Sequence, residues 1–241
     1  ELNLLRACEI WASAAEGGWT LSTEGLYAVG CEAGQRAFNQ VFVTAPGLDA
    51  NALRTVTSSY EHGRFRLRMR DELHDSVRDA VAAVGLQRQG GIPAMTFTGE
   101  LDAADAGLLI EPVTNEARLA EHVRIVTEAF GWTPDILGRI FTPKLIEQPD
   151  WAAWVGYADG AAVTTAQLVV HENVAGLYYV ATVKAAQRKG YGDAITRHAV
   201  REGQARGCDL VCLQASPLGH PVYERIGFNV IGEYITYVPH D

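Results

Sequence analysis

Cysteine is scarce in this sequence, and its spacing forms no site of a known kind. The four cysteines, Cys8, Cys31, Cys208 and Cys212, include no Cys-x-x-Cys pair, and no histidine stands at metal-ligand spacing from them. Secreted disulfide scaffolds and structural zinc sites both need closer or more numerous cysteines. We therefore expect a reducing, cytoplasmic location and no bound metal.

Long apolar runs are also missing. The longest lie near residues 80–86 and 175–183, well short of the roughly 20 residues that a membrane-spanning helix needs. The first residues, from Glu1 to Arg6, lack the basic start and apolar stretch of a secretory signal. We therefore expect no membrane partner.

Positive charge is in deficit, since 20 Lys and Arg stand against 29 Asp and Glu, a formal net charge of -9. Such a protein repels nucleic acid, so we expect no nucleic-acid partner. The composition, 48% hydrophobic and 20% charged, is that of a globular protein. A chain of 241 residues suffices for one large domain or two ordinary ones.

The second half alternates short apolar strands with amphipathic helices. Asn115 is placed to cap a helix, and Asp159-Gly160 between two β-rich runs is a hairpin signal. In chain order, the pattern predicts a strand at 107–113, helices at 115–130 and 134–146, strands at 151–157, 161–171 and 176–183, a helix at 192–206, a strand at 210–214, a short helix around Val222 and a last strand at 228–237.

The first half repeats the later part of this order more faintly. The pattern predicts strands at 37–43, 65–69 and 92–97 and helices at 50–60 and 76–84. An offset of 142 lays Gly85 on Gly227 and Gly90 on Gly232, as in duplicated domains. Two unrelated α/β units are the alternative. We place the boundary at residues 98–106, which have no strong pattern.

The segment after residue 183 has the features of a phosphate-binding loop. A buried strand leads into a loop containing Gly190 and Gly192, which then opens a helix. Such a loop can direct several backbone N–H groups at one point, and the helix N-terminus adds partial positive charge. Arg188 and Lys189 supply further local charge. A Gly-x-Gly before a helix is by itself more often only a turn.

The loop motif together with a second motif resembles the GCN5-related N-acetyltransferase (GNAT) superfamily, which are acetyl-CoA-dependent enzymes. The loop reads Gln-x-x-Gly-x-Gly from Gln187, and some 30 residues later comes Tyr223-Glu-Arg-Ile-Gly-Phe. The resemblance covers residues 107–239. It implies an α/β (α+β) fold with a mixed, mostly antiparallel central sheet flanked by helices, in two tandem copies: a GNAT domain at 106–241 and a degenerate, non-catalytic copy at 1–100 that shapes the acceptor cleft or closes an interface.

The resemblance also implies roles for named residues. The strand backbone at Val180, Ala181 and Thr182 would bond the pantetheine arm of acetyl-CoA. Tyr223 would protonate the leaving CoA thiolate, and Ser216 stands where many members carry an asparagine near the CoA arm. The pyrophosphate would be held by Gln187, Arg188, Lys189, Gly190, Tyr191, Gly192 and Asp193.

A general base is not evident. An amine attacks a thioester only as the free base, and the histone acetylases of this superfamily carry a glutamate where this chain has Gly176. His171, Glu172, His220 and Glu224 stay open as bases, each of them more often an ordinary turn or surface residue. A backbone N–H around Thr182 is the expected oxyanion donor.

We therefore expect an acetyl-CoA-dependent N-acetyltransferase that moves an acetyl group directly to a primary amine. The alternative is a non-catalytic acyl-CoA-binding sensor or interaction module. The acceptor is not identified, although the net negative charge mildly favours a cationic amine. Trp132, Trp151 and Trp154 either line an acceptor pocket or belong to the core, and a homo-oligomer is left open.

Overall fold

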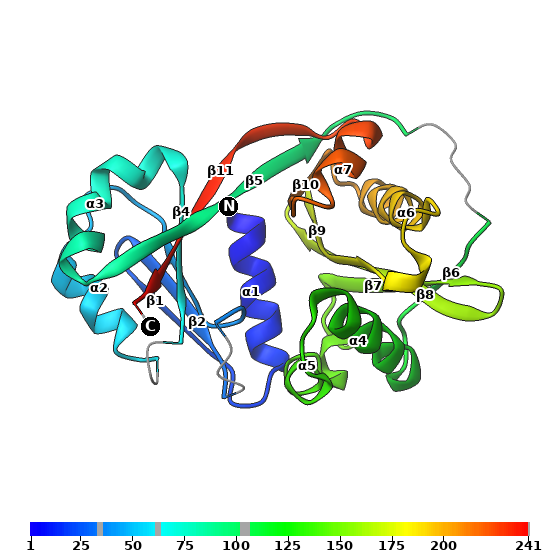
Figure 1. The fold of residues 1–241 in the computed structure, drawn as a ribbon, viewed down its shortest axis with the longest axis horizontal. Coiled ribbons are helices and arrows are strands. Elements are labelled where there is room, and N and C mark those ends of the chain that lie inside the picture. The colour runs from blue at the N-terminus through cyan, green and yellow to red at the C-terminus, as the bar shows by residue number, and fades with distance from the viewer. Residues whose placement is uncertain (33–35, 61–63, 102–106, 241) are drawn as a thin grey trace.

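The computed structural model describes residues 1–32, 36–60, 64–101 and 107–240 (Figure 1). Within these ranges, the first half of the chain contains three α-helices and five strands. They are α1 (Leu2–Ala14), β1 (Trp19–Thr23), β2 (Leu26–Gly30), β3 (Gln40–Val43), α2 (Ala50–Thr57), β4 (Arg66–Arg70), the 3-10 turn η2 (Asp71–Leu73), α3 (His74–Ala83) and β5 (Leu86–Phe97).

The second half contains four helices and six strands among the described residues. They are β6 (Leu109–Pro112), α4 (Glu116–Phe130), α5 (Pro134–Ile140), the 3-10 turn η3 (Pro143–Leu145), β7 (Trp151–Ala158), β8 (Ala161–His171), β9 (Val174–Thr182), the 3-10 turn η4 (Lys184–Ala186), α6 (Tyr191–Ala205), β10 (Leu210–Gln214), α7 (His220–Ile226) and β11 (Asn229–Pro239).

Every element predicted from the sequence is present in the structure, with end shifts of a few residues. One of them is divided, because the helix predicted at 134–146 ends at Ile140 and a separate turn begins at Pro143. Proline cannot continue a helix and disfavours helical geometry at the residue before it, here Thr142. The sequence analysis missed α1, β1 and β2. No side chain caps the start of α1, so the usual start signal is absent.

The eleven strands of the described residues form one mixed, mostly antiparallel sheet in the order β1-β2-β3-β4-β11-β5-β10-β9-β8-β7-β6. The last strand of each half crosses into the other half. β11 lies between β4 and β5, and β5 lies between β11 and β10. Figure 1 shows the pair running side by side from one half to the other. The two halves of the chain therefore share their central strands.

The pairing of β5 with β11 has a local two-fold character. Ile92 pairs with Tyr234, and these positions are equivalent at the offset of 142. The register shifts skip Gln89 in one strand and Ile231 in the other, again 142 residues apart. Each shift adjoins a glycine with positive φ, 153° at Gly90 and 159° at Gly232, as β-bulges often do. This register agrees with the predicted duplication.

The predicted domain bounds, 1–100 and 106–241, remain a prediction. Within the boundary placed at 98–106, residues 102–106 lie outside the described part of the chain. Strand pairing across the boundary is extensive, since β11 is bonded to β4 and β5 of the first half. A simple cut of the chain at this point would therefore separate hydrogen-bonded strands.

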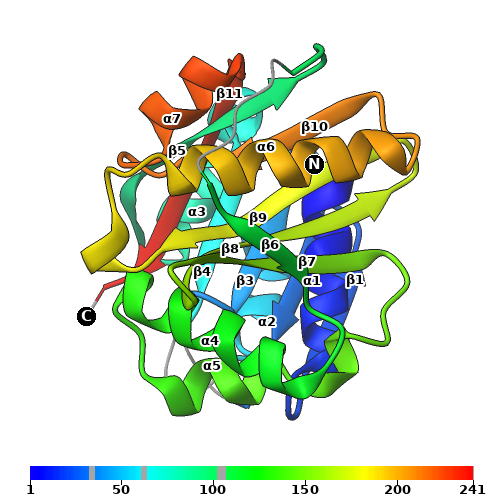
Figure 2. The same cartoon turned by 90° about the vertical axis from the view of Figure 1, so that its right-hand side faces the viewer.

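Helices cover both faces of the second half of the sheet. In Figures 1 and 2, α6 lies on one face and α4 and α5 lie on the other. The helix α1 lies between the two halves and contacts β8 and β9 of the second half as well as β1 and β2 of the first. None of the helices in the described ranges has the length and apolar character needed to cross a membrane.

Candidate active site

The site lies where two parallel strands separate. β9 pairs with β10 only from Val174 to Gly176, opposite Leu210 to Cys212. Beyond that point β9 continues beside β8 alone, and its register shifts at a bulge that contains Tyr179, whose φ is 49°. The separation leaves the β10-facing backbone groups of residues 180–182 without a strand partner.

A cavity of about 670 Å³ occupies this separation. Its walls come from the end of β9, the loop before α6, and the turn and helix α7 after β10. Ten of the twelve predicted site residues line it: Val180, Ala181, Thr182, Gln187, Arg188, Gly190, Gly192, Asp193, Ser216 and Tyr223. The other two do not: the side chain of Lys189 is exposed, and that of Tyr191 packs against the core.

The loop before α6 presents a row of backbone amides. Arg188 has φ of 63° and Gly190 has φ of 83°, so left-handed residues stand on both sides of Lys189. The first amide bonded within the helix is that of Ala194, which donates to the Gly190 carbonyl. The amides of residues 188–193 donate to no other described residue. Alternating backbone conformations of this kind form concave anion sites, and the start of a helix adds to their positive potential.

The side chains at this end of the cavity carry net positive charge. Arg188 and Arg225 line the cavity. Asp193 would oppose an anion, but its carboxylate accepts a hydrogen bond from Arg197 Nε at 2.7 Å in a largely buried ion pair. Gln187 Nε2 donates to the Thr182 carbonyl at 3.2 Å, which fixes the loop to the end of β9.

Gly192 keeps the middle of the loop open. A Cβ at this position would lie 3.6 Å from Thr182 Oγ1 and would meet no other atom within 4 Å outside its neighbours. The protein would therefore tolerate a side chain here, which would project toward the cavity that Gly192 lines. The amides, the charges and this open space together fit the pyrophosphate and pantetheine arm of CoA.

Tyr223 forms part of the opposite wall. Its side chain is 8% exposed, and burial raises the pKa of its phenol to about 12. The ring packs against Phe228 and lies close to Gly219, where a Cβ would come within 2.7 Å of it. The phenol therefore keeps its proton at neutral pH and can donate it into the cavity.

Ser216 lines the cavity and also stabilises the turn before α7. Its Oγ accepts a hydrogen bond from the Gly219 amide at 3.1 Å, and its carbonyl accepts one from the His220 amide. It thus holds the turn that begins α7. Its hydroxyl retains one proton to donate toward the cavity.

None of the four candidate bases lines the cavity. His171 and Glu172 lie at the β8–β9 turn, at the end of β9 away from the loop. His220 Nδ1 lies 3.5 Å from Glu224 Oε2 on α7. Within the described ranges, no group of three or more His, Cys, Asp or Glu residues is placed to hold a metal ion.

Asn3 of α1 occupies the space beside Gly176, the position where the histone acetylases of the family carry a glutamate. A Cβ at Gly176 would lie 1.9 Å from Asn3 Oδ1. Asn3 Nδ2 donates to the carbonyls of Val169 and Val174, both at 2.9 Å, and its Oδ1 accepts from Tyr178 at 2.8 Å. The sequence analysis missed this residue. Its only signal is an amide side chain in the otherwise apolar start of α1.

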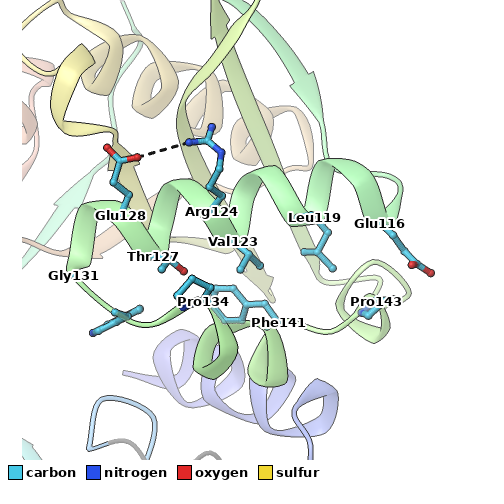
Figure 3. A pocket seen from close by; sticks show the side chains of 13 residues that line it. Glu116, Leu119, Val123, Arg124, Thr127, Glu128, Gly131, Pro134, Phe141 and Pro143 are labelled. Atoms are coloured by element: carbon cyan, nitrogen blue, oxygen red, sulfur yellow. Dashed lines mark ion pairs between the residues drawn. The ribbon is translucent and has the colours of Figure 1, made fainter.

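A second cavity, of about 690 Å³, lies between α4 and α5 (Figure 3). Apolar side chains including Val123 and Phe141 point into it, and an Arg124–Glu128 ion pair at 3.7 Å lies at its edge. None of the residues predicted for acetyl-CoA lines it, but Trp132 does. The loop residues Arg188, Gly190 and Gly192 line the other cavity instead.

The other two tryptophans belong mainly to the core. Trp151 and Trp154 are 5% and 4% exposed. They border a separate hollow of about 380 Å³ beside the C-terminal half of α6, whereas the loop lies at the N-terminus of that helix. Core packing is therefore the better interpretation of both.

Comparison with known proteins gives a family and a fold. The family model described as an acetyltransferase (GNAT) domain matches residues 149–230. A GCN5-related N-acetyltransferase from Kribbella flavida superposes with a TM-score of 0.74 at 16% identity, covering 98% of this chain and 95% of that one. No curated protein gives a significant match.

Two further solved structures have a similar fold over most of their length. A putative GNAT acetyltransferase from Novosphingobium aromaticivorans has a TM-score of 0.63 at 14% identity, with 92% of each chain covered. A GCN5-related N-acetyltransferase from Sphaerobacter thermophilus has a TM-score of 0.61 at 17% identity, covering 88% of this chain and 76% of that one. Residues 149–230 of this chain are thus similar to the GNAT acetyltransferase domain, and the chain as a whole has a GNAT-like fold.

Proposed function

We propose that this protein transfers an acetyl group from acetyl-CoA to a primary amine, directly and without a covalent enzyme intermediate. The observation that carries the proposal is the row of unbonded amides at residues 188–193, at the mouth of the separation between β9 and β10. Tyr223 faces the same cavity from α7. A pyrophosphate held on the amides would leave the arm of the same molecule free to extend along the end of β9.

Each group of residues has a defined task in this proposal. Acetyl-CoA supplies the activated acyl group when it is bound. The amides and positive side chains of the loop bind its pyrophosphate, while the exposed backbone of Val180–Thr182 aligns its arm in strand fashion. A backbone N–H next to the bulge at Tyr179 stabilises the developing oxyanion. Tyr223, with its raised pKa, gives its proton to the departing thiolate.

A non-catalytic acyl-CoA sensor is the second candidate. One observation favours it: of the carboxylates and histidines in the described residues, only Asp193 lines the cavity, and Arg197 already binds it. Deprotonation of an ammonium would then depend on water, or on an amine that arrives uncharged. Steady release of CoA in the presence of an amine would exclude the sensor.

Titration calorimetry with acetyl-CoA tests the shared premise of both candidates. We expect micromolar binding by the wild type and a loss of at least about tenfold in Gly192→Asp, because the added carboxylate enters the anion site. Gly138→Asp is the matched control, since it adds the same charge at an exposed position of α5 with open space around its Cβ. If the wild type does not bind acetyl-CoA, the loop is only structural and the enzyme assignment fails.

A further inference from the structure

The strand β4 carries charge on a face that the rest of the molecule covers. Its sequence alternates along Arg66–Arg70, so the arginines share one face and the apolar residues share the other. Leu67 and Met69 are fully buried under α2 and α3. On the arginine face, Arg68 stands beside Phe42 of β3, which belongs to the core cluster between the two halves of the chain. The arginine face therefore adjoins this junction, where Arg66 and Arg68 are partly exposed and the Arg70 side chain is 37% exposed.

Buried polar atoms without a partner collect on this face. Tyr27 pairs in register with Phe42, Gln40 pairs with Arg66, and Thr236 pairs with Arg68, so all lie on neighbouring strands of one face. Five of their side-chain atoms have no hydrogen-bond partner among the described residues: Arg66 Nε, Arg68 Nε, Tyr27 OH, Gln40 Oε1 and Thr236 Oγ1. Buried polar groups normally have partners. This concentration of unpaired groups indicates a place that another molecule fills.

Arg68 differs from its neighbour Arg70. Arg70 lies 3.2 Å from Glu1 and 2.6 Å from Glu72, so its charge is balanced within the chain. No hydrogen bond or ion pair joins Arg68 to a carboxylate of the described residues, and burial lowers the pKa of its guanidinium, with Arg66 acting in the same direction. An arginine nevertheless remains charged in proteins. The Arg68 side chain is only partly exposed and its Nε is buried, so an approaching anion would stabilise its charge.

Arg68 also lies near the proposed place of acyl transfer. Its neighbour in register, Phe42, belongs to the core cluster that includes Cys8 of α1 and against which Tyr179 of β9 packs. Tyr179 is the bulge residue immediately before Val180–Thr182. The same tyrosine contacts Phe141, with ring centroids 4.9 Å apart. The first half of the chain thus brings a cation, and the second half an aromatic wall, to the end of the acyl site.

We propose that Arg68 binds the carboxylate of the acceptor, so that the substrate is a small amine that also carries a carboxylate, such as an amino acid. This inference rests on the proposed acetyltransferase function. A guanidinium binds a carboxylate through two parallel hydrogen bonds and so fixes its orientation. Held there, the amine end points toward the bulge at Tyr179. The local cation outweighs the net charge of -9, which by itself favours a cationic acceptor.

Pairs of amines that differ only in the carboxylate test this assignment. We would measure CoA release and thermal shift with the common amino acids and with their carboxamides. The wild type should raise its Tm with at least one amino acid and should prefer it over its amide by tenfold or more in kcat/KM. In Arg68→Gln, the preference and the Tm shift should both disappear, while acetyl-CoA affinity stays unchanged. Arg68→Lys keeps the charge without the two-pronged geometry and should retain part of the preference.

Arg70→Gln is the matched control, because it removes an arginine of the same face whose charge Glu1 and Glu72 already balance. It should keep the wild-type preference. Two results would overturn the inference: equal use of amino acids and amides by the wild type, or an unchanged preference in Arg68→Gln and Arg68→Lys. Preference for phosphoethanolamine over every amino acid would also overturn it, in favour of a phosphate ligand. Failure of the wild type to bind acetyl-CoA would instead refute the proposed function.

Discussion

At the scale of single residues, the position of Tyr223 agrees with the sequence prediction, whereas the reason for Gly176 is visible only in the structure. The family resemblance implies a role for Tyr223, and its phenol lies in the wall of the cavity with a pKa raised to about 12 by burial. Gly176 was read as a missing base. The structure adds the reason for the glycine, since Asn3 occupies the space where a side chain would stand.

We expect Tyr223→Phe to lower turnover by about ten- to a thousandfold, the usual range for loss of a general acid. The ring remains, so its packing on Phe228 and the affinity for acetyl-CoA should be nearly unchanged. Steady-state assays of CoA release and calorimetry measure the two effects separately. Tyr191→Phe is the control, because Tyr191 adjoins the loop but does not line the cavity. Full turnover in Tyr223→Phe would remove this residue from the mechanism.

At the scale of elements, a buried hydrogen-bond chain joins α1, α4 and the sheet. Thr165 Oγ1 donates to the Trp154 carbonyl at 2.6 Å, so it accepts from Nδ1 of His122, also at 2.6 Å. The other ring nitrogen then accepts from Gln167 at 2.7 Å, and Gln167 Oε1 accepts from Trp11 at 3.1 Å. Only Nδ1 of the His122 ring then carries a proton, so the network requires a neutral histidine. The chain orients α1, and so places Asn3 at the start of β9.

This network predicts a loss of stability in acid. Burial lowers the pKa of His122 to about 3, whereas an unfolded histidine has a pKa near about 6.5. Below about pH 6.5 this histidine is protonated in the unfolded chain but stays neutral in the folded chain. The free energy of unfolding therefore decreases as the pH is lowered. From pH 7.5 to 5.5 the loss should be about 1.4 kcal/mol.

Urea unfolding of the wild type and of His122→Gln at these two pH values measures the effect. The variant should be less stable at both, because it disturbs the buried chain, but it should lack this part of the pH slope. His171→Gln removes a histidine from the β8–β9 turn and should keep the wild-type slope. An identical slope in wild type and His122→Gln would show that His122 takes up its proton equally in both states.

At the scale of the whole molecule, the halves complete one another. β11 is hydrogen-bonded only to β4 and β5, and both of these strands belong to the first half. β5 in turn provides the antiparallel partner of β10. If the first half is absent, β11 has no partner and one edge of β10 is exposed. The first half of the chain therefore stabilises the fold of the second half, whether or not it also shapes the acceptor cleft.

We expect residues 107–241 expressed alone to be aggregated or unfolded, since unpaired strand edges are prone to association. The same fragment expressed together with residues 1–101 should assemble into a soluble pair with the full-length unfolding profile. Size-exclusion chromatography and circular dichroism melts distinguish these outcomes. A monomeric, cooperatively folded 107–241 fragment would contradict the expectation and support separable domains. Full turnover by such a fragment would also exclude a role of the first half in shaping the acceptor cleft.

The sequence by itself determined the features that depend on neighbouring residues. The loop from Gln187 to Gly192, the cap at Asn115 and the hairpin at Asp159 are local signals, and each is present where it was predicted. The offset of 142 also relates the bulges of β5 and β11, because each bulge adjoins a glycine whose positive φ other residues rarely adopt. The helix α1 was missed because its apolar run has no capping residue at its start.

Only the tertiary structure decided which of these features meet. Asn3 bonds to carbonyls 166 and 171 residues away, and no periodic pattern encodes such a contact. The arginines of β4 form one polar face of an amphipathic strand, and the strand order places β3 and β11 on either side of it. Periodicity tells which side of a strand is charged, but only long-range packing tells whether that side faces water or a buried site. The proposed acceptor specificity therefore depends on the exchange of strands between the two halves.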